Sequence, residues 1–127
     1  MDEQRLVNSL INAFKKRGYE ILRAVGGNYQ EPYKIGRHEP DIIARDPESG
    51  LIIIGEAKTT EGLFSPYTKE QLLDFAQRVM AEGLSRGKRI PLHIIVPKAE
   101  LGKVEGLLTE LGLEREIGLN IILWYEE

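Results

Sequence analysis

The sequence predicts an α/β protein in which helices cover both faces of a central mixed β-sheet. Segments with helical spacing of apolar residues alternate with short apolar runs, in the order α-β-β-β-α-β-α-β along 127 residues. Two of the runs are joined by a short turn, as in an antiparallel hairpin, whereas the later runs are separated by helical segments, as parallel strands require. No linker, repeat or low-complexity tract interrupts the chain, so we expect a single domain over residues 1–127.

The first half of the chain predicts one helix and three strands. Apolar residues at helical spacing indicate an amphipathic helix from about residue 2 to 17, which Gly18 ends. A strand is expected over 19–25, followed by a polar connection to residue 37 that is long for so small a domain, and long ordered loops are often functional. Strands over 41–45 and 51–58 follow, with their turn at residues 47–50.

The second half predicts two helices and two strands. A helix is expected from about residue 68 to 84, with Thr68 and Gln71 as a capping box at its start. The nearly all-apolar run 90–96 is typical of a strand inside a sheet that is covered on both faces. A helix over 98–111 and a strand over 120–125 complete the fold.

Composition limits the classes of protein. The absence of cysteine excludes a disulfide framework and a thiolate metal site, which favours a reducing, cytoplasmic location. The charged N-terminus is unlike a secretory signal, and no apolar run is long enough to cross a bilayer, so no membrane is expected. The formal net charge of −3 lacks the positive field of a strong nucleic-acid binder.

Three charged residues lie at the ends of the two hairpin strands. Glu56 and Lys58 are two residues apart and so point to the same side, and the hairpin brings Asp41 beside them. Two carboxylates and a lysine can hold a hard divalent cation while the ammonium meets a phosphate or an attacking water. The alternative is a strand start after a proline and an ordinary surface ion pair. Glu56 follows Ile52 and Ile54 on one face of its strand, and an acid among apolar neighbours is costly without a cation or a hydrogen-bond partner, which favours the interpretation as a site.

Pro40-Asp41 and Glu56-Ala57-Lys58 resemble the motif of the PD-(D/E)xK nuclease superfamily. Within it, segments 16–19, 22–27, 40–43, 56–60 and 70–71 are similar to the archaeal Holliday-junction resolvases. The resemblance implies a restriction-endonuclease-like fold and a homodimer that cleaves structured or branched DNA in repair or recombination. It also implies Mg²⁺, with Mn²⁺ as a substitute, bound by Asp41, Glu56 and the carbonyl of Ala57. No organic cofactor is implied. Gln71 matches a glutamine that such nucleases place near the site.

Further residues are candidates for DNA contacts. Lys34, Arg37 and Lys69 would meet phosphates, although basic clusters are also typical of solvated surfaces. Tyr67, like Tyr33, would stack on an unpaired base or, alternatively, cover the edge of the core.

Two departures from the resolvase pattern bear on junction specificity. Val7 stands where those proteins carry a glutamate on the first helix, and Gly27-Asn28 stand where they carry a serine. Glu3 is either an additional acid of the site or an acid that favours a first helical turn.

Other polar and aromatic residues are less informative. We interpret His38 and His93 as structural, because Mg²⁺ prefers oxygen and His93 lies in an apolar strand. Trp124 and Tyr125 belong to the core or to an oligomer contact.

Function is therefore expected in one of two classes. The first is a Mg²⁺-dependent endonuclease acting on DNA. The second is a non-catalytic nucleic-acid-binding or scaffold module that keeps the same fold in a repair, restriction or defence assembly. A small-ligand α/β domain is disfavoured, because no Gly-rich phosphate loop follows a strand and opens a helix.

Overall fold

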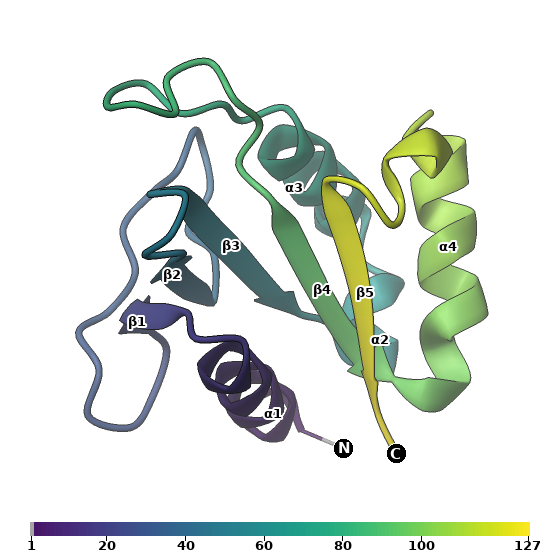
Figure 1. Cartoon of the computed structure of the whole chain (residues 1–127). Coiled ribbons are helices and arrows are strands. Elements are labelled where there is room, and N and C mark those ends of the chain that lie inside the picture. The colour runs from purple at the N-terminus through teal and green to yellow at the C-terminus, as the bar shows by residue number, and fades with distance from the viewer. Residues whose placement is uncertain (1) are drawn as a thin grey trace.

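The computed structural model describes residues 2–127 and contains one five-stranded mixed sheet (Figure 1). The strands lie in chain order from β1 to β5, with β1–β2 and β2–β3 antiparallel and β3–β4 and β4–β5 parallel. The expected α/β class and mixed sheet are confirmed. The strands are β1 (Glu20–Ala24), β2 (Ile42–Arg45), β3 (Ile52–Ala57), β4 (Leu92–Pro97) and β5 (Ile121–Glu126).

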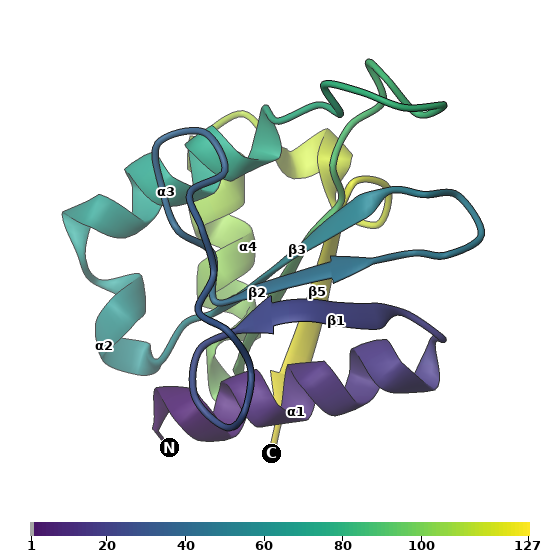
Figure 2. The same cartoon turned by 90° about the vertical axis from the view of Figure 1, so that its left-hand side faces the viewer.

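Helices cover both faces of this sheet, as predicted. Helix α1 (Glu3–Lys16) lies on one face, and α3 (Pro66–Ala76) and α4 (Leu101–Glu110) lie on the other (Figure 2). The buried side chains accordingly form two clusters, one beneath α1 and one beneath α3 and α4. A single turn of helix, α2 (Thr60–Leu63), connects β3 to α3.

Helix α1 has the features that its sequence predicts. Its five apolar residues at helical spacing, Leu6, Val7, Leu10, Ile11 and Phe14, are all buried. The side chain of Asp2 caps the helix by accepting a hydrogen bond from the backbone N–H of Arg5 at 2.8 Å. Gly18, with a φ of 82°, turns the chain into β1.

Glycine in β3 lets this helix approach the sheet closely. A Cβ on Gly55 would lie 3.0 Å from Cβ of Ile42 and 3.1 Å from a methyl carbon of Leu10. Gly55 therefore fixes how close α1 lies to the hairpin that carries the charged residues. No helix in residues 2–127 has the length and apolar character needed to span a membrane.

The segment after β3 differs from the prediction. The expected 68–84 helix begins at Pro66 and ends at Ala76, and α2 was not predicted. The capping box was also wrong, because Ser65 caps α3 and the buried Thr68 hydroxyl instead donates to the carbonyl of Gly62 at 2.5 Å. Residues beyond the helix end form an irregular loop, in which Gly83 and Gly87 have positive φ angles that a helix does not allow.

Candidate active site

The predicted acids meet where β3 ends and β2 begins. The backbone N–H of Asp41 donates to Oε1 of Glu56 at 2.8 Å, and the backbone N–H of Ala57 donates to Oδ2 of Asp41 at 2.9 Å. Each carboxylate is thus held by the backbone of the segment that carries the other. These two hydrogen bonds hold the side chains side by side.

Lys58 and Gln71 complete the constellation. The ammonium of Lys58 lies 3.5 Å from Oε2 of Glu56 and donates a hydrogen bond to Oε1 of Gln71, which reaches down from α3. The backbone N–H of Lys58 donates to the carbonyl of Ile95 at 3.0 Å, so the residue is anchored to β4. The structure therefore brings together all four residues that the sequence singled out as catalytic.

Burial makes this pair of acids electrostatically unfavourable. The pKa of Asp41 rises from 3.8 to about 6, chiefly because burial disfavours the charged form; the negative charge of Glu3 contributes to this rise, while the Ala57 N–H and Lys58 act in the opposite direction. Glu56 is 1% exposed, and burial followed by the charge of Asp41 lifts its pKa well above the ordinary value, against the lowering effect of Lys58. A cation between these acids would relieve their repulsion.

Glu3 lies in the first turn of α1, where acids are favoured, and its negative charge also acts on Asp41. This charge raises the pKa of Asp41, although the side chain of Glu3 is exposed. Val7, at the position aligned with the resolvase glutamate, is fully buried in the core. An acid therefore comes from the same helix, but one turn earlier than the alignment placed it.

The available oxygen atoms fit a hard cation. Asp41 and Glu56 each have one oxygen that accepts from a backbone N–H, and their second oxygens accept from none among residues 2–127. With the carbonyl of Ala57, which the family resemblance suggested, these oxygens would supply the all-oxygen ligands that Mg²⁺ prefers. No group of three or more His, Cys, Asp or Glu side chains in the described part of the chain could hold a metal, so a cation here would depend on that carbonyl and on water.

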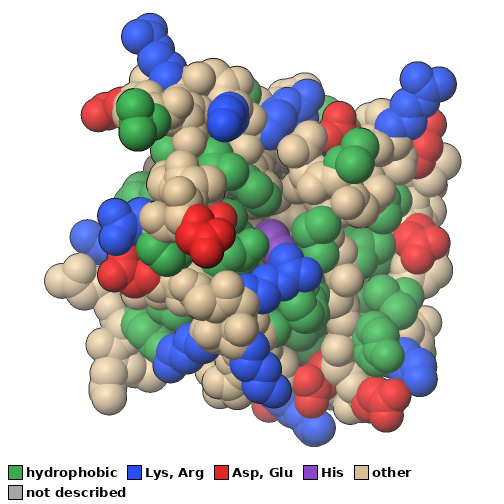
Figure 3. All heavy atoms as spheres, in the orientation of Figure 1, with side chains coloured by type: hydrophobic (Ala, Val, Ile, Leu, Met, Phe, Trp, Pro, Cys, Tyr) green, Lys and Arg blue, Asp and Glu red, His purple; other side chains and the backbone are tan. Residues whose placement is uncertain are grey.

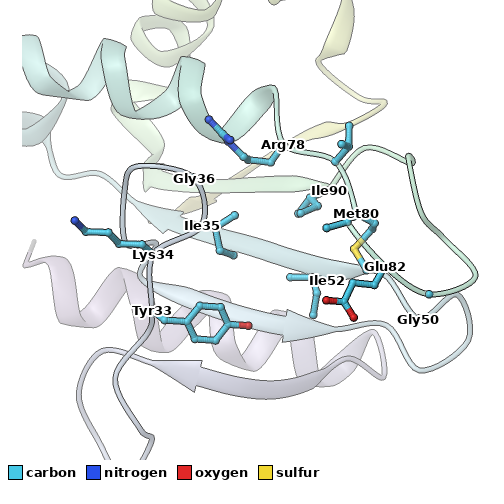
Figure 4. A pocket seen from close by; sticks show the side chains of 13 residues that line it. Tyr33, Lys34, Ile35, Gly36, Gly50, Ile52, Arg78, Met80, Glu82 and Ile90 are labelled. Atoms are coloured by element: carbon cyan, nitrogen blue, oxygen red, sulfur yellow. The ribbon is translucent and has the colours of Figure 1, made fainter.

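The candidate DNA contacts do not form one basic surface. Lys69 pairs with Glu110 on α4 at 2.7 Å, and Figure 3 shows lysine and arginine side chains scattered among acidic and apolar ones on the face in view. Lys34 lines a hollow of about 740 Å³ with Tyr33, Ile52 and Met80, and its side chain extends away from these residues (Figure 4). Tyr67 is 54% exposed and lies over His38.

Both histidines are buried, and His93 lies in the core as its apolar strand predicted. His93 accepts a hydrogen bond from the indole N–H of Trp124 at 2.9 Å, and burial together with the charge of Arg17 lowers its pKa to about 3. It is therefore a neutral core residue. His38 contacts Asp74, an acid on α3 that sequence reasoning did not single out, although it stands among the apolar residues Leu72, Leu73, Phe75 and Ala76.

Comparisons of the chain with protein-family models, with curated proteins and with solved structures find no match. The interpretation of the site therefore rests on its own residues and geometry.

Proposed function

We propose that the chain is a Mg²⁺-dependent endonuclease that hydrolyses phosphodiester bonds in DNA. The observation that supports this most is the pairing of the partly buried Asp41 with the buried Glu56, cross-linked by backbone hydrogen bonds and flanked by Lys58. An uncompensated pair of buried acids is costly, and a phosphodiesterase uses such a pair to hold the cation that its reaction needs. Mn²⁺ is expected to substitute for Mg²⁺.

Each residue has a distinct role in this proposal. Asp41, Glu56 and the carbonyl of Ala57 would bind the cation, which supplies charge neutralisation at the phosphoryl oxygens and lowers the pKa of bound water. Lys58 would hold its ammonium against the scissile phosphate, where negative charge grows during cleavage. Gln71 directs that ammonium by accepting its hydrogen bond.

The finer parts of the proposal rest on the likeness of the motif residues to those of the resolvases. They are a restriction-endonuclease-like fold, structured or branched DNA as substrate, and a homodimer that cuts two strands symmetrically. The α/β architecture with a mixed sheet agrees with that fold. The effect of the Glu3 charge on the pKa of Asp41 supports an acid from the first helix near the site.

A non-catalytic DNA-binding or scaffold module is the second candidate. It is favoured by the net charge of −3 and by the ion pair of Lys69 with Glu110, which removes one expected phosphate contact.

Cleavage of labelled linear, single-stranded, flapped and four-way-junction DNA with Mg²⁺ tests the proposal. The wild type should give products that EDTA abolishes, and Asp41→Asn should bind the same DNA without cutting it. Binding of DNA without cleavage of any substrate by the wild type would reject the endonuclease and favour the module.

A further inference from the structure

A second polar cluster joins the loop before Asp41 to helix α3. Nδ1 of His38 lies 2.7 Å from Oδ2 of Asp74, and the backbone N–H of Arg37 donates to the same oxygen at 3.0 Å. Oδ1 of Asp74 accepts a hydrogen bond from the guanidinium of Arg78, one turn later on the same segment. We call Gly36, Arg37, His38, Asp74 and Arg78 the loop–helix clamp.

Gly36 brings the loop backbone directly against Arg78. A Cβ at Gly36 would lie 2.5 Å from Cζ of Arg78, and the φ of Gly36 is +71°, so no other residue fits without displacement. Figure 4 shows the guanidinium of Arg78 turned back toward α3 rather than into the hollow beneath it. Arg78 therefore serves the contact between loop and helix.

The two acid–base residues of the clamp, His38 and Asp74, are buried, and the proton between them has a defined position. His38 is 4% exposed and Asp74 is 3% exposed. Burial acts to raise the pKa of Asp74, but hydrogen bonds from His38, the Arg37 N–H and Arg78 outweigh it, so the pKa lies below its ordinary value. An ionised carboxylate can only accept hydrogen bonds, so Nδ1 of His38 carries the proton and donates it.

The two sides of the clamp lead directly to the candidate active site. His38 is separated from Asp41 by only Glu39 and Pro40, and the proline ring restricts that short link. On the other side, Gln71, which binds Lys58, lies three residues before Asp74 on α3. The clamp therefore fixes the segment that carries one proposed metal ligand relative to the helix that holds the lysine.

We propose that His38 and Asp74 are positioning residues that hold Asp41 and Gln71 in their places in the site. The catalytic part of this inference rests on the proposed function. A buried charged contact is a weak source of stability, because desolvation offsets much of its attraction. What it supplies is a fixed geometry, since the hydrogen bonds at Asp74 allow one arrangement of loop and helix.

Three variants separate positioning from a general loss of stability. His38→Leu removes the donor, whereas His38→Asn places an amide N–H about where Nδ1 lies and should restore the contact. Trp124→Phe is the matched control, because it removes another side-chain hydrogen bond to a buried histidine, on β5, which is separated from β3 by β4.

Amide hydrogen exchange of residues 36–39 and Asp41, and calorimetric Mg²⁺ binding, are the readouts. His38→Leu should speed exchange there and weaken Mg²⁺ binding by about tenfold each, since a lost hydrogen bond to a charged group typically has an effect of this order. His38→Asn should stay within about threefold of the wild type, and Trp124→Phe should lower Tm while changing neither readout. On a cleaved substrate, His38→Leu should lower kcat more than it raises KM.

The inference is overturned if His38→Leu keeps wild-type exchange and Mg²⁺ affinity, if His38→Asn fails to restore them, or if Trp124→Phe changes them equally. Should His38→Leu not fold, Gly36→Ala replaces it: this variant lies at an exposed loop position, its methyl group would displace Arg78, and the same two readouts apply. The two proposals fail separately. If the wild type cuts no DNA, the endonuclease is rejected, and amide hydrogen exchange of the His38 variants still tests the clamp. If the wild type cuts DNA and the His38 variants behave like it, the clamp alone is rejected.

Discussion

Replacing Asp41 with asparagine should stabilise the metal-free protein at neutral pH. The raised pKa means that the folded state binds a proton more tightly than the unfolded chain, so ionising Asp41 costs folding free energy. The asparagine keeps a side-chain oxygen for the N–H of Ala57 and carries no charge to bury. This prediction needs neither DNA nor cleavage, so it tests the electrostatics of the site directly.

The magnitude follows from the shift of the pKa. A rise from 3.8 to about 6 corresponds to about 3 kcal/mol at about 1.4 kcal/mol per pH unit, as an upper limit. Below about pH 4 both states hold the proton and the penalty is absent. It accumulates as pH rises from about 4 to 6, because only the unfolded chain has then lost its proton, and it is constant above that range. Glu56, whose pKa is also raised by burial, adds a penalty of the same sign.

Urea unfolding of both proteins in EDTA, at pH values from about 4 to 8, measures this difference. The asparagine variant should be more stable by up to about 3 kcal/mol at pH 8, and the gap should close toward pH 4. Mg²⁺ should then stabilise the wild type and leave the variant unchanged. A variant that is less stable than the wild type across the whole range would refute the reasoning.

Three further perturbations test other parts of the structure. Lys58→Met should abolish cleavage while DNA binding, measured by anisotropy, persists; wild-type cutting rates would exclude Lys58 from the mechanism. Glu3→Gln should lower the pKa of Asp41, as followed by carboxyl ¹³C shifts, because it removes a nearby negative charge. An unchanged titration of Asp41 would show that the charge of Glu3 has no influence on it. Gly55→Ala should lower the free energy of unfolding, measured in urea, by about 1–3 kcal/mol, because the added methyl group meets Ile42 and Leu10. A urea midpoint equal to that of the wild type would mean that α1 can move away from the sheet at no cost in stability.

The core of the site could be predicted because it depends on local rules. Alternation along a strand places Glu56 and Lys58 on one side, and a short turn requires the hairpin that brings Asp41 to them. The burial of α1 followed in the same way from its apolar spacing. These inferences need only the geometry of single elements and their nearest neighbours.

Tertiary contacts explain what the sequence did not show. The end of α3 at Ala76 was missed because the apolar residues Val79 and Met80 continue a helical pattern, while Val79 pairs in a bridge with Arg89. Asp74 was missed because its partners His38 and Arg37 are more than thirty residues away in the sequence. No periodicity within one segment reports such a distant partner.

The reciprocal hydrogen bonds between Asp41 and the end of β3 can form only when β2 and β3 pair in the correct register. Ile42 lies opposite Gly55 in the native hairpin, and a slip of one residue would turn the side chains of one strand to the opposite face of the sheet. Misaligned chains would then lack the paired carboxylates. A bound cation would draw the folding equilibrium toward the correct alignment by mass action, so cellular metal supply would influence how much of the chain reaches its native fold.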